Sequence, residues 1–266
     1  MLNLNPDEQR VALVTGGGKG IGAGIVRILE SYGVRCCINC SHNPAMANAL
    51  CEELKGEGKE CFVYQADISN PDEVEAMVQE IIDRYGRLDI LVNNAAVQPN
   101  KFIDEYDVND LKWIWDTNIG GYCNAARAVW PYITKSPMPT IVNISSVHAK
   151  RPTCFDCGYA MTKGAIRMLT RELALDIFNY GGTCNALELG AVYIEFKSGQ
   201  AEKKSDAPIV RPLPGCENEE ISRRLAHEQH VRKEEIGEMV WFLCNEGGRG
   251  FNGAGLRMDK GHMLVV

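Results

Sequence analysis

Short apolar runs alternate with longer amphipathic stretches along most of this chain. Unbroken apolar runs of this length predict buried strands, and apolar residues that recur every three or four positions predict helices. The predicted strands cover residues 11–15, 35–39, 61–65, 89–93, 140–145 and 183–188, with a last strand around 255–258. The predicted helices cover residues 21–32, 45–54, 71–85, 109–133 and 159–178. This alternation predicts an α/β fold, a doubly wound parallel sheet with helices on both faces and right-handed crossovers.

Length and composition fit a single domain over residues 1–266, because no linker interrupts the pattern. A hydrophobic fraction of 45% with 24% charged residues indicates a globular chain. The net charge of −7 and the lack of a basic cluster argue against a nucleic-acid partner. No run approaches the roughly 20 apolar residues of a membrane span, and residues 1–8 show no signal-peptide pattern. We therefore expect a cytoplasmic protein without membrane contact.

Eleven cysteines are many for a chain without an export signal, and their number is odd. We interpret them as reduced, mostly packed thiols. Several lie in predicted strands: Cys36, Cys37, Cys61 and Cys184. Cys154 and Cys157 follow His148, but a metal site built from these three lacks a clear fourth ligand. We expect no metal and favour two loop thiols, while a redox disulfide between the pair stays open.

A glycine-rich turn follows the first predicted strand and opens the first predicted helix. Gly16, Gly20 and Gly22 punctuate this turn. Glycines let the backbone turn tightly and approach a pyrophosphate, whose charge then meets the amide groups of the helix N-terminus. Because strand, glycine turn and helix follow one another, the sequence predicts a dinucleotide site.

Tyr159 and Lys163 are four residues apart on a predicted helix, and Ser146 lies thirteen residues before the tyrosine. Positions i and i+4 share one helix face, so the lysine ammonium can stand beside the phenol. A free tyrosine has a pKa near ~10, and a neighbouring cation favours the phenolate and lowers that pKa. This group therefore predicts proton transfer to and from an alcohol oxygen. Taken alone, the pair also fits an ordinary amphipathic helix.

Together these residues resemble the short-chain dehydrogenase/reductase family over nearly the whole chain, which implies a Rossmann-type fold. The run Asn93-Asn94-Ala95-Ala96 is similar to a family segment after the fourth strand, with Ala96 in place of glycine. Asp67 resembles the family's adenine-contacting acid, and Asn118 the asparagine that holds a water in its proton relay. Two plainer interpretations stay open: Asn118 as a helix cap or kink, and Asp67 as a turn residue before Ser69-Asn70-Pro71.

The resemblance implies an oxidoreductase that interconverts a secondary alcohol and a ketone by hydride transfer. Tyr159 would act as acid and base, and Ser146 would hold the substrate oxygen. Lys163 would lower the tyrosine pKa and bind the nicotinamide ribose, with Asn118 behind it in the relay. The residues expected at the cofactor are Gly16, Lys19, Gly20, Ile21, Gly22, Ser41, His42, Asp67, Ile68, Asn94, Ala95, Tyr159, Lys163, Gly190 and Val192.

The choice of cofactor depends on the end of the second strand, where NAD-binding proteins usually place an acid. The segment Ser41-His42-Asn43 contains none, and Lys19 stands in the glycine turn. These residues suit a 2′-phosphate through charge and hydrogen bonds. We therefore expect NADP, with NAD as the alternative and a solvated Lys19 as the plainer interpretation.

Three departures from the family pattern fall on the cofactor side. Leu189 replaces a proline, Ile194 replaces a threonine, and Lys260 stands where a glycine is usual. They leave room for a nicotinamide-binding sensor with little turnover. The irregular, proline-containing stretch around 190–216 corresponds to the family's substrate lid, which excludes water when it closes.

The substrate class stays open at this stage. The run Ser145-Ser146-Val147-His148 resembles that of glucose-dehydrogenase-like members. Ser146, His148, Gln98 and Tyr159 are the expected substrate contacts, with Glu188 as a further polar group near the site. A sugar, polyol or other hydroxyl compound fits these groups, and a steroid-type substrate is the alternative. An acyl-carrier substrate is less attractive because that carrier and this chain are both acidic.

Two of the predicted helices, 109–133 and 159–178, carry apolar residues on more than one face. They include Trp113, Trp115, Trp130, Met168 and Leu169. In the family the corresponding helices pack against their copies in another subunit. We therefore expect a homotetramer, or at least a dimer. The alternative is that these side chains belong to a wide core-facing stripe.

Overall fold

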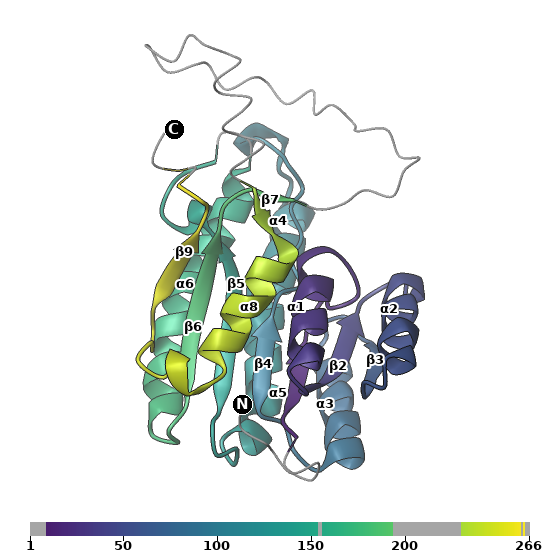
Figure 1. Ribbon diagram of the computed structural model, residues 1–266. Helices are drawn as coiled ribbons and strands as arrows, with labels where there is room; N and C mark the ends of the chain where they lie inside the picture. The colour runs from purple at the N-terminus through teal and green to yellow at the C-terminus, as the bar shows by residue number, and fades with distance from the viewer. Residues whose placement is uncertain (1–8, 154–155, 194–229, 262, 264–266) are drawn as a thin grey trace.

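Seven parallel strands form the centre of the molecule (Figure 1). The computed structural model describes residues 9–153, 156–193, 230–261 and 263. The strands lie in the order β3-β2-β1-β4-β5-β6-β9. Their bounds are β1 (Val11–Val14), β2 (Arg35–Cys40), β3 (Cys61–Gln65), β4 (Ile90–Asn93), β5 (Thr140–Ser146), β6 (Thr183–Leu189) and β9 (Gly255–Met258). The predicted strands and the α/β fold class are confirmed, with ends that differ by one residue at most.

Helices cover both faces of the sheet. On one face lie α1 (Gly20–Ser31), α2 (Ala45–Gly56) and α8 (Lys233–Leu243). On the other lie α3 (Pro71–Tyr85), α5 (Gly121–Ile133) and α6 (Cys157–Phe178). Shorter helices are α4 (Val108–Trp115), η2 (Ile103–Glu105), η4 (Val147–Ala149) and η5 (Glu246–Gly248). None of the described helices is long and apolar enough to cross a bilayer.

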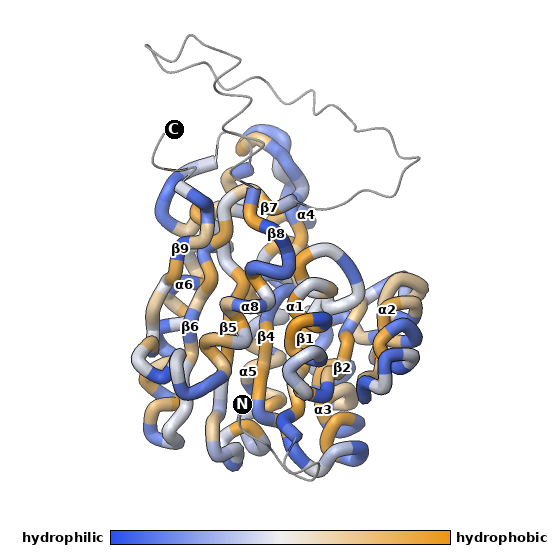
Figure 2. The backbone as a smooth tube through the Cα atoms, in the orientation of Figure 1, coloured by the Kyte–Doolittle hydropathy of each residue, from blue (hydrophilic) through white to orange (hydrophobic). Residues whose placement is uncertain are grey.

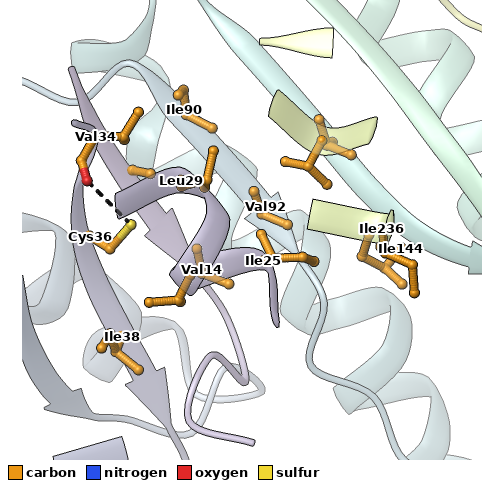
Figure 3. Packing of buried hydrophobic residues seen from close by; sticks show 14 of the residues in the cluster. Val14, Ile25, Leu29, Val34, Cys36, Ile38, Ile90, Val92, Ile144 and Ile236 are labelled. Atoms are coloured by element: carbon orange, nitrogen blue, oxygen red, sulfur yellow. Dashed lines mark hydrogen bonds between the residues drawn. The ribbon is translucent and has the colours of Figure 1, made fainter. Parts of the chain in front are cut away.

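The apolar side chains lie between these layers. The central strands β1 and β4 are mostly orange in Figure 2, as expected when both faces of a parallel sheet are buried. In Figure 3, Ile25 and Leu29 of α1 pack against Val14 and Val92 of the central strands, and Ile236 of α8 lies beside Ile144. The predicted strand cysteines are buried free thiols: Cys36, Cys37, Cys61 and Cys184.

The prediction of one helix over 109–133 is wrong. The chain forms α4, then a five-residue π-turn at Asp116–Gly120, then α5. Asn118 lies within this π-turn and is fully buried. Turns of this type interrupt the regular hydrogen-bond ladder, and they occur often at functional sites.

The sequence analysis did not anticipate α8 or the small sheet formed by β7 (Val192–Tyr193) and β8 (Val231–Arg232). The predicted lid begins in this region. Residues 190–193 are described, whereas residues 194–216, which include Ile194, lie outside the described residues. Cys154 also lies outside them, and Cys157 begins α6.

Candidate active site

The candidate site lies at the carboxyl ends of the central strands. The strand order reverses between β1 and β4, and ligands of open α/β sheets bind at such a point. A cavity of about 140 Å³ opens here. Its lining residues are Ile21, Asn94, Ala96, Ile144, Ser145, Ser146, Tyr159, Lys163, Leu189, Gly190 and Val192.

The glycine turn lies directly beside this cavity. Gly16 and Gly20 have φ angles of 61° and 52°, in the left-handed region that favours glycine. A Cβ on Gly22 would stand 2.2 Å from the Gly16 oxygen and 2.7 Å from Asn94 Nδ2. The turn therefore tolerates no side chain at this point, and the backbone remains accessible at the N-terminus of α1.

Two residues that the sequence analysis missed hold this turn in place. Thr15 is buried, and its Oγ1 accepts hydrogen bonds from the backbone amides of Asn94 (2.9 Å) and Ala95 (3.1 Å). Asn39 accepts from the Gly16 amide at 3.2 Å and donates to the Ala66 carbonyl at 3.0 Å. Their polarity within apolar strands was the available signal, because a buried polar side chain needs hydrogen-bond partners.

The predicted catalytic side chains come together. Ser146 ends β5, while Tyr159 and Lys163 lie one turn apart in α6, and all three line the cavity. Lys163 is buried, donates a 3.0 Å hydrogen bond to the Ile144 carbonyl, and places Nζ 5.3 Å from the centre of the Tyr159 ring. Ser146 Oγ accepts from the His148 amide at 3.2 Å.

Burial controls the protonation of this group. Desolvation raises the pKa of Tyr159, which a hydrogen bond with Ser146 partly offsets and the Asp156 carboxylate reinforces. Desolvation also lowers the pKa of Lys163 to about 7. Burial disfavours the charged form of both side chains, so the lowering of the tyrosine pKa by Lys163 stays a prediction.

Asn118 connects two parts of the site. Its Oδ1 accepts from the Val97 amide at 2.8 Å, and its Nδ2 donates to the Val97 carbonyl at 3.0 Å. The same Nδ2 reaches Thr162 Oγ1 at 3.1 Å. Thr162, another residue that the sequence analysis missed, in turn donates to the Tyr159 carbonyl. Asn118 thus ties the loop after β4 to the helix that carries the tyrosine.

The residues expected at a 2′-phosphate are exposed on two connected segments of the chain. Lys19 precedes α1, while Ser41 and His42 follow β2, and their side chains are exposed or partly exposed. The glycine turn is joined to the end of β2 by the hydrogen bond from the Gly17 amide to the Asn39 carbonyl. His42 Nδ1 lies 2.8 Å from Ser41 Oγ.

Asp67 and Ile68 lie in the turn after β3, where both contact neighbouring parts of the protein. Asp67 Oδ1 accepts hydrogen bonds from the amide and the hydroxyl of Ser69. One carboxylate oxygen of Asp67 therefore stabilises the turn, as the plainer interpretation expects. The Ile68 side chain is buried against Gly121 of α5, and its carbonyl accepts from Asn124. A cofactor contact by either residue stays a prediction.

Three polar residues expected near the substrate lie outside the cavity lining. Gln98 is exposed on the loop after β4, and His148 follows Ser146 with its ring nitrogen 3.4 Å from the Arg151 carbonyl. Glu188 is fully buried, and it pairs with Lys150 at 2.7 Å and Arg167 of α6 at 3.6 Å. The idea that Glu188 offers a polar group to the substrate is wrong, because its carboxylate faces these two cations.

The segment after β6 is held by the last strand. The Gly190 amide donates to the Met258 carbonyl at 2.9 Å, and a Cβ on Gly190 would meet Asp259 Cβ at 2.6 Å. Leu189 is buried and lines the cavity, whereas Lys260 adopts a φ of 47°. That left-handed conformation explains why a glycine is usual at position 260.

Comparisons with known proteins follow this geometry. The "short chain dehydrogenase" family profile matches residues 10–205. The hydroxynaphthalene reductase arp2 of Aspergillus fumigatus is 32% identical over 256 residues, which cover 93% of this chain and 90% of that protein. The 3-oxoacyl-acyl-carrier-protein reductase FabG of Staphylococcus aureus is 32% identical over 200 residues, 75% of this chain and 81% of that protein.

Solved structures agree with the family match. A short-chain dehydrogenase from Burkholderia cenocepacia in complex with NADP has a TM-score of 0.81 and 25% identity, covering 98% of this chain and 99% of that one. A metagenomic blue fluorescent protein in complex with NADPH has a TM-score of 0.80 and 29% identity, covering 95% and 97%. This chain belongs to the short-chain dehydrogenase/reductase family of oxidoreductases.

Proposed function

We propose that this protein interconverts a secondary alcohol and a ketone with a nicotinamide cofactor, preferably NADP, and that Tyr159 is its acid and base. One observation supports this most directly. The cavity brings Ser146, Tyr159 and Lys163 together beside a glycine turn that a single Cβ would block. A proton-transfer group next to a dinucleotide cradle is what a hydride-transfer enzyme requires.

The residues of the turn fit a dinucleotide. Gly20 and Gly22 place no side chain on the first turn of α1, and a helix N-terminus favours a pyrophosphate. Lys163, Asn94 and Gly190 line the adjoining cavity and would hold the nicotinamide ribose end. When bound, the nicotinamide ring supplies or accepts the hydride.

The protein's own part is to position the substrate oxygen and to move a proton. Ser146 and Tyr159 would both hydrogen-bond the substrate oxygen, which fixes the reacting carbon relative to the cofactor. A raised pKa keeps the Tyr159 phenol protonated, which suits its role as proton donor to a ketone oxygen in the reductive direction. Asn118 and Thr162 hold the backbone on either side of the phenol.

NADP is proposed as the preferred cofactor because Lys19, Ser41 and His42 lie near the glycine turn and β2 ends without an acid. Two structural neighbours were solved with NADP or NADPH. Lys19→Ala should weaken NADPH binding more than NADH binding, since only the former carries the 2′-phosphate. Equal losses for both cofactors would show that Lys19 does not contact that phosphate.

The substrate is proposed as a ketone or secondary alcohol of small or medium size. A suitable panel combines a fused bicyclic ketone such as 2-tetralone, a 3-oxoacyl ester, glucose and a hydroxysteroid. The first two correspond to the names of the two reductase relatives, and the last two to the sugar and steroid alternatives. The pattern of rates across this panel identifies the substrate class.

The decisive experiment follows NADPH oxidation or NADP reduction by absorbance with this panel. Tyr159→Phe should retain NADPH binding and lose turnover by at least about 10²-fold, the scale of general acid–base catalysis. A phenylalanine variant with near-native rate would refute the proposed mechanism. NADPH binding without turnover on any substrate would instead support the nicotinamide-sensor alternative.

A further inference from the structure

Asp156 precedes the helix that carries the catalytic tyrosine, and its side chain is buried with 2% of its surface exposed. Its Oδ1 accepts from the Tyr159 amide at 2.9 Å and thereby caps α6. The same oxygen accepts a short hydrogen bond from the Tyr106 hydroxyl, and Oδ2 accepts from the Asn100 amide at 2.8 Å. One carboxylate therefore accepts hydrogen bonds from two separate segments of the chain.

The second of these segments is the loop after β4, which leads to η2 and α4. Asn118 fixes its beginning at Val97, and Asp156 fixes it again at Asn100 and Tyr106. Asn100 adopts a left-handed φ of 59°, an uncommon conformation that asparagine tolerates. The loop therefore has a defined path between its two anchors.

Gly158 completes this arrangement. A Cβ at Gly158 would lie 2.7 Å from the Tyr106 hydroxyl oxygen, so glycine lets the tyrosine ring lie directly on the first turn of α6. The Tyr106 hydroxyl can then reach Asp156. Desolvation and the carboxylate raise the pKa of Tyr106, which keeps its hydroxyl protonated and able to donate.

A buried carboxylate is an expensive way to cap a helix, because desolvation penalises the charge. Among the α-helices that the structure describes, the other N-caps with side-chain hydrogen bonds are Asn70 of α3 and Asp107 of α4, and both are exposed. The Asp156 contacts therefore go beyond those of an ordinary cap. Its side chain accepts hydrogen bonds from Tyr159 in α6 and from Asn100 and Tyr106 in the loop after β4.

We propose that Asp156 is a positioning residue for Tyr159: it holds the first turn of α6 and the 97–106 loop in one fixed arrangement, so that the phenol and the adjoining loop keep their relative places. This inference rests on the proposed function. It adds a residue that touches neither cofactor nor substrate and that acts through the backbone of Tyr159.

The charge of Asp156 gives this role a measurable signature. The groups near the Tyr159 phenol are Ser146 from β5, Lys163 from α6 itself, and Tyr122 from α5. Asp156 adds a negative charge that disfavours the phenolate and so raises the pKa of Tyr159. Removing that charge should lower the pKa of Tyr159, while the positioning itself is measured by kcat.

The main variant is Asp156→Asn, which keeps the shape and one acceptor oxygen but removes the charge. It should reduce kcat for the best substrate of the panel by roughly 10- to 100-fold, the scale of a small misplacement of a reacting group. NADPH affinity should stay within about twofold, because the side-chain hydrogen bonds of Asp156 go to Asn100, Tyr106 and Tyr159 and not to the glycine turn. Tyr106→Phe keeps the charge and the cap, and it should lower kcat without lowering the pKa of Tyr159.

Asn70→Ala is the matched control, since it removes the N-cap of α3 and should leave kcat unchanged.

Carbon-13-labelled tyrosine, with the Tyr159→Phe spectrum to assign the signal, reports the titration of Tyr159 with or without turnover. A lower kcat in Asp156→Asn with NADPH affinity retained supports the inference, and a native kcat overturns it whatever the midpoint. Should wild type neither bind NADPH nor turn over any panel substrate, the proposed function fails and this inference fails with it, whereas a native kcat in Asp156→Asn of an active enzyme overturns the inference alone. If Asp156→Asn does not fold, a native kcat in Tyr106→Phe overturns the inference.

Discussion

At the scale of single residues, burial and charge have opposite effects on the proposed catalytic group. Lys163 is fully desolvated inside α6, and this lowers its pKa to about 7. Its hydrogen bond to the Ile144 carbonyl fixes the position of Nζ in either protonation state. The lysine is therefore held ready for a ligand while its charge responds to the pH and to neighbouring charges.

The first prediction concerns proton uptake when the cofactor binds. At pH 8, above its pKa of about 7, Lys163 is mostly neutral in the free protein. An anionic cofactor favours the charged lysine and raises that pKa, so binding should draw a proton from solvent. The 2′-phosphate does not contribute at this pH, because the second pKa of a phosphate monoester is near ~6. Calorimetry in buffers of different ionisation enthalpy measures the uptake.

Two variants sharpen this measurement. Lys163→Met should bind NADPH without taking up a proton. Lys19→Met, which alters an exposed residue of the glycine turn, should weaken binding and leave the uptake in place. Uptake that survives in Lys163→Met would show that another group titrates.

At the scale of elements, the glycine turn between β1 and α1 has no spare volume. In Gly22→Ala the new Cβ would meet the Gly16 oxygen at 2.2 Å, and a backbone atom cannot swing away. We expect a loss of about 1–3 kcal/mol in the free energy of unfolding, as for other overpacked sites, and a large loss of NADPH affinity. Urea unfolding and NADPH fluorescence titration measure the two effects.

Gly56→Ala is the matched control for that substitution. Gly56 ends α2, and a Cβ there would have nothing within 4 Å. The free energy of unfolding should be unchanged or higher by up to about 1 kcal/mol, because alanine is the better helix former. Similar losses in both variants would mean that crowding in the turn is not the cause.

Glu30, at the junction of α1 and β2, should make the free energy of unfolding depend on pH. The side chain is buried and accepts from the Cys36 amide at 2.8 Å, and desolvation raises its pKa from 4.5 to about 7. The unfolded chain loses this proton near pH 4.5 and the folded chain near 7, so Glu30 makes stability fall as the pH rises through that window. Glu30→Gln should be more stable than wild type at pH 8 by up to about 3 kcal/mol, the full value of such a shift.

Urea unfolding at pH 5 and pH 8 tests this difference. Glu52→Gln on the exposed face of α2 serves as the control and should show the wild-type pH dependence. An equal pH dependence in Glu30→Gln and wild type would contradict the prediction.

Most of the strands and helices could be predicted from the sequence. Each buried strand is a compact apolar run, so the pattern located all seven within a residue. Helix 109–133 was predicted as one element because its apolar periodicity continues across Asp116–Gly120. The π-turn is accompanied by hydrogen bonds between Asn118 and Val97, a contact between distant segments that no local pattern records. The α8 helix was missed because its charged first turn obscures the pattern of its short apolar face.

In the candidate site, too, some residues could be predicted from the sequence and others could not. Ser146, Tyr159 and Lys163 were predictable because their spacing encodes their chemistry. Thr15, Asn39 and Thr162 were missed because each acts by a hydrogen bond to a segment whose position depends on the whole fold. Asp156 was missed for the same reason.

At the scale of the whole molecule, exposed apolar side chains gather on helices α4 and α6. They are Val108, Trp113, Trp115, Met161, Met168, Leu175 and Phe178. Trp130, by contrast, packs against the core and the edge of Tyr180, so the wide-stripe explanation holds for this residue. Leu175 and Phe178 are 70% and 69% exposed, which is unusual for large apolar groups close together on one helix.

The last prediction is therefore assembly through these helices as a dimer or homotetramer. Light scattering at micromolar concentration should give a multiple of the 29.4 kDa chain mass. Leu175→Arg should shift the mass toward the monomer, because a charge in an apolar interface is costly. Met46→Arg on α2 removes a comparably exposed side chain and should leave the mass unchanged. A monomer mass for active wild-type protein would refute the assembly.

The π-turn at Asp116–Gly120 also determines what a change of chain length would do at this point. Its hydrogen bond runs from the Gly121 amide to the Asp116 carbonyl, so the turn holds one residue more than a turn of α-helix does. Deleting one residue here would restore a regular helix and leave α4 and α5 facing in nearly the same directions. The cost would fall on Asn118, whose hydrogen bonds to Val97 and Thr162 start from this turn. A single-residue deletion would therefore spare the core and disturb the candidate site.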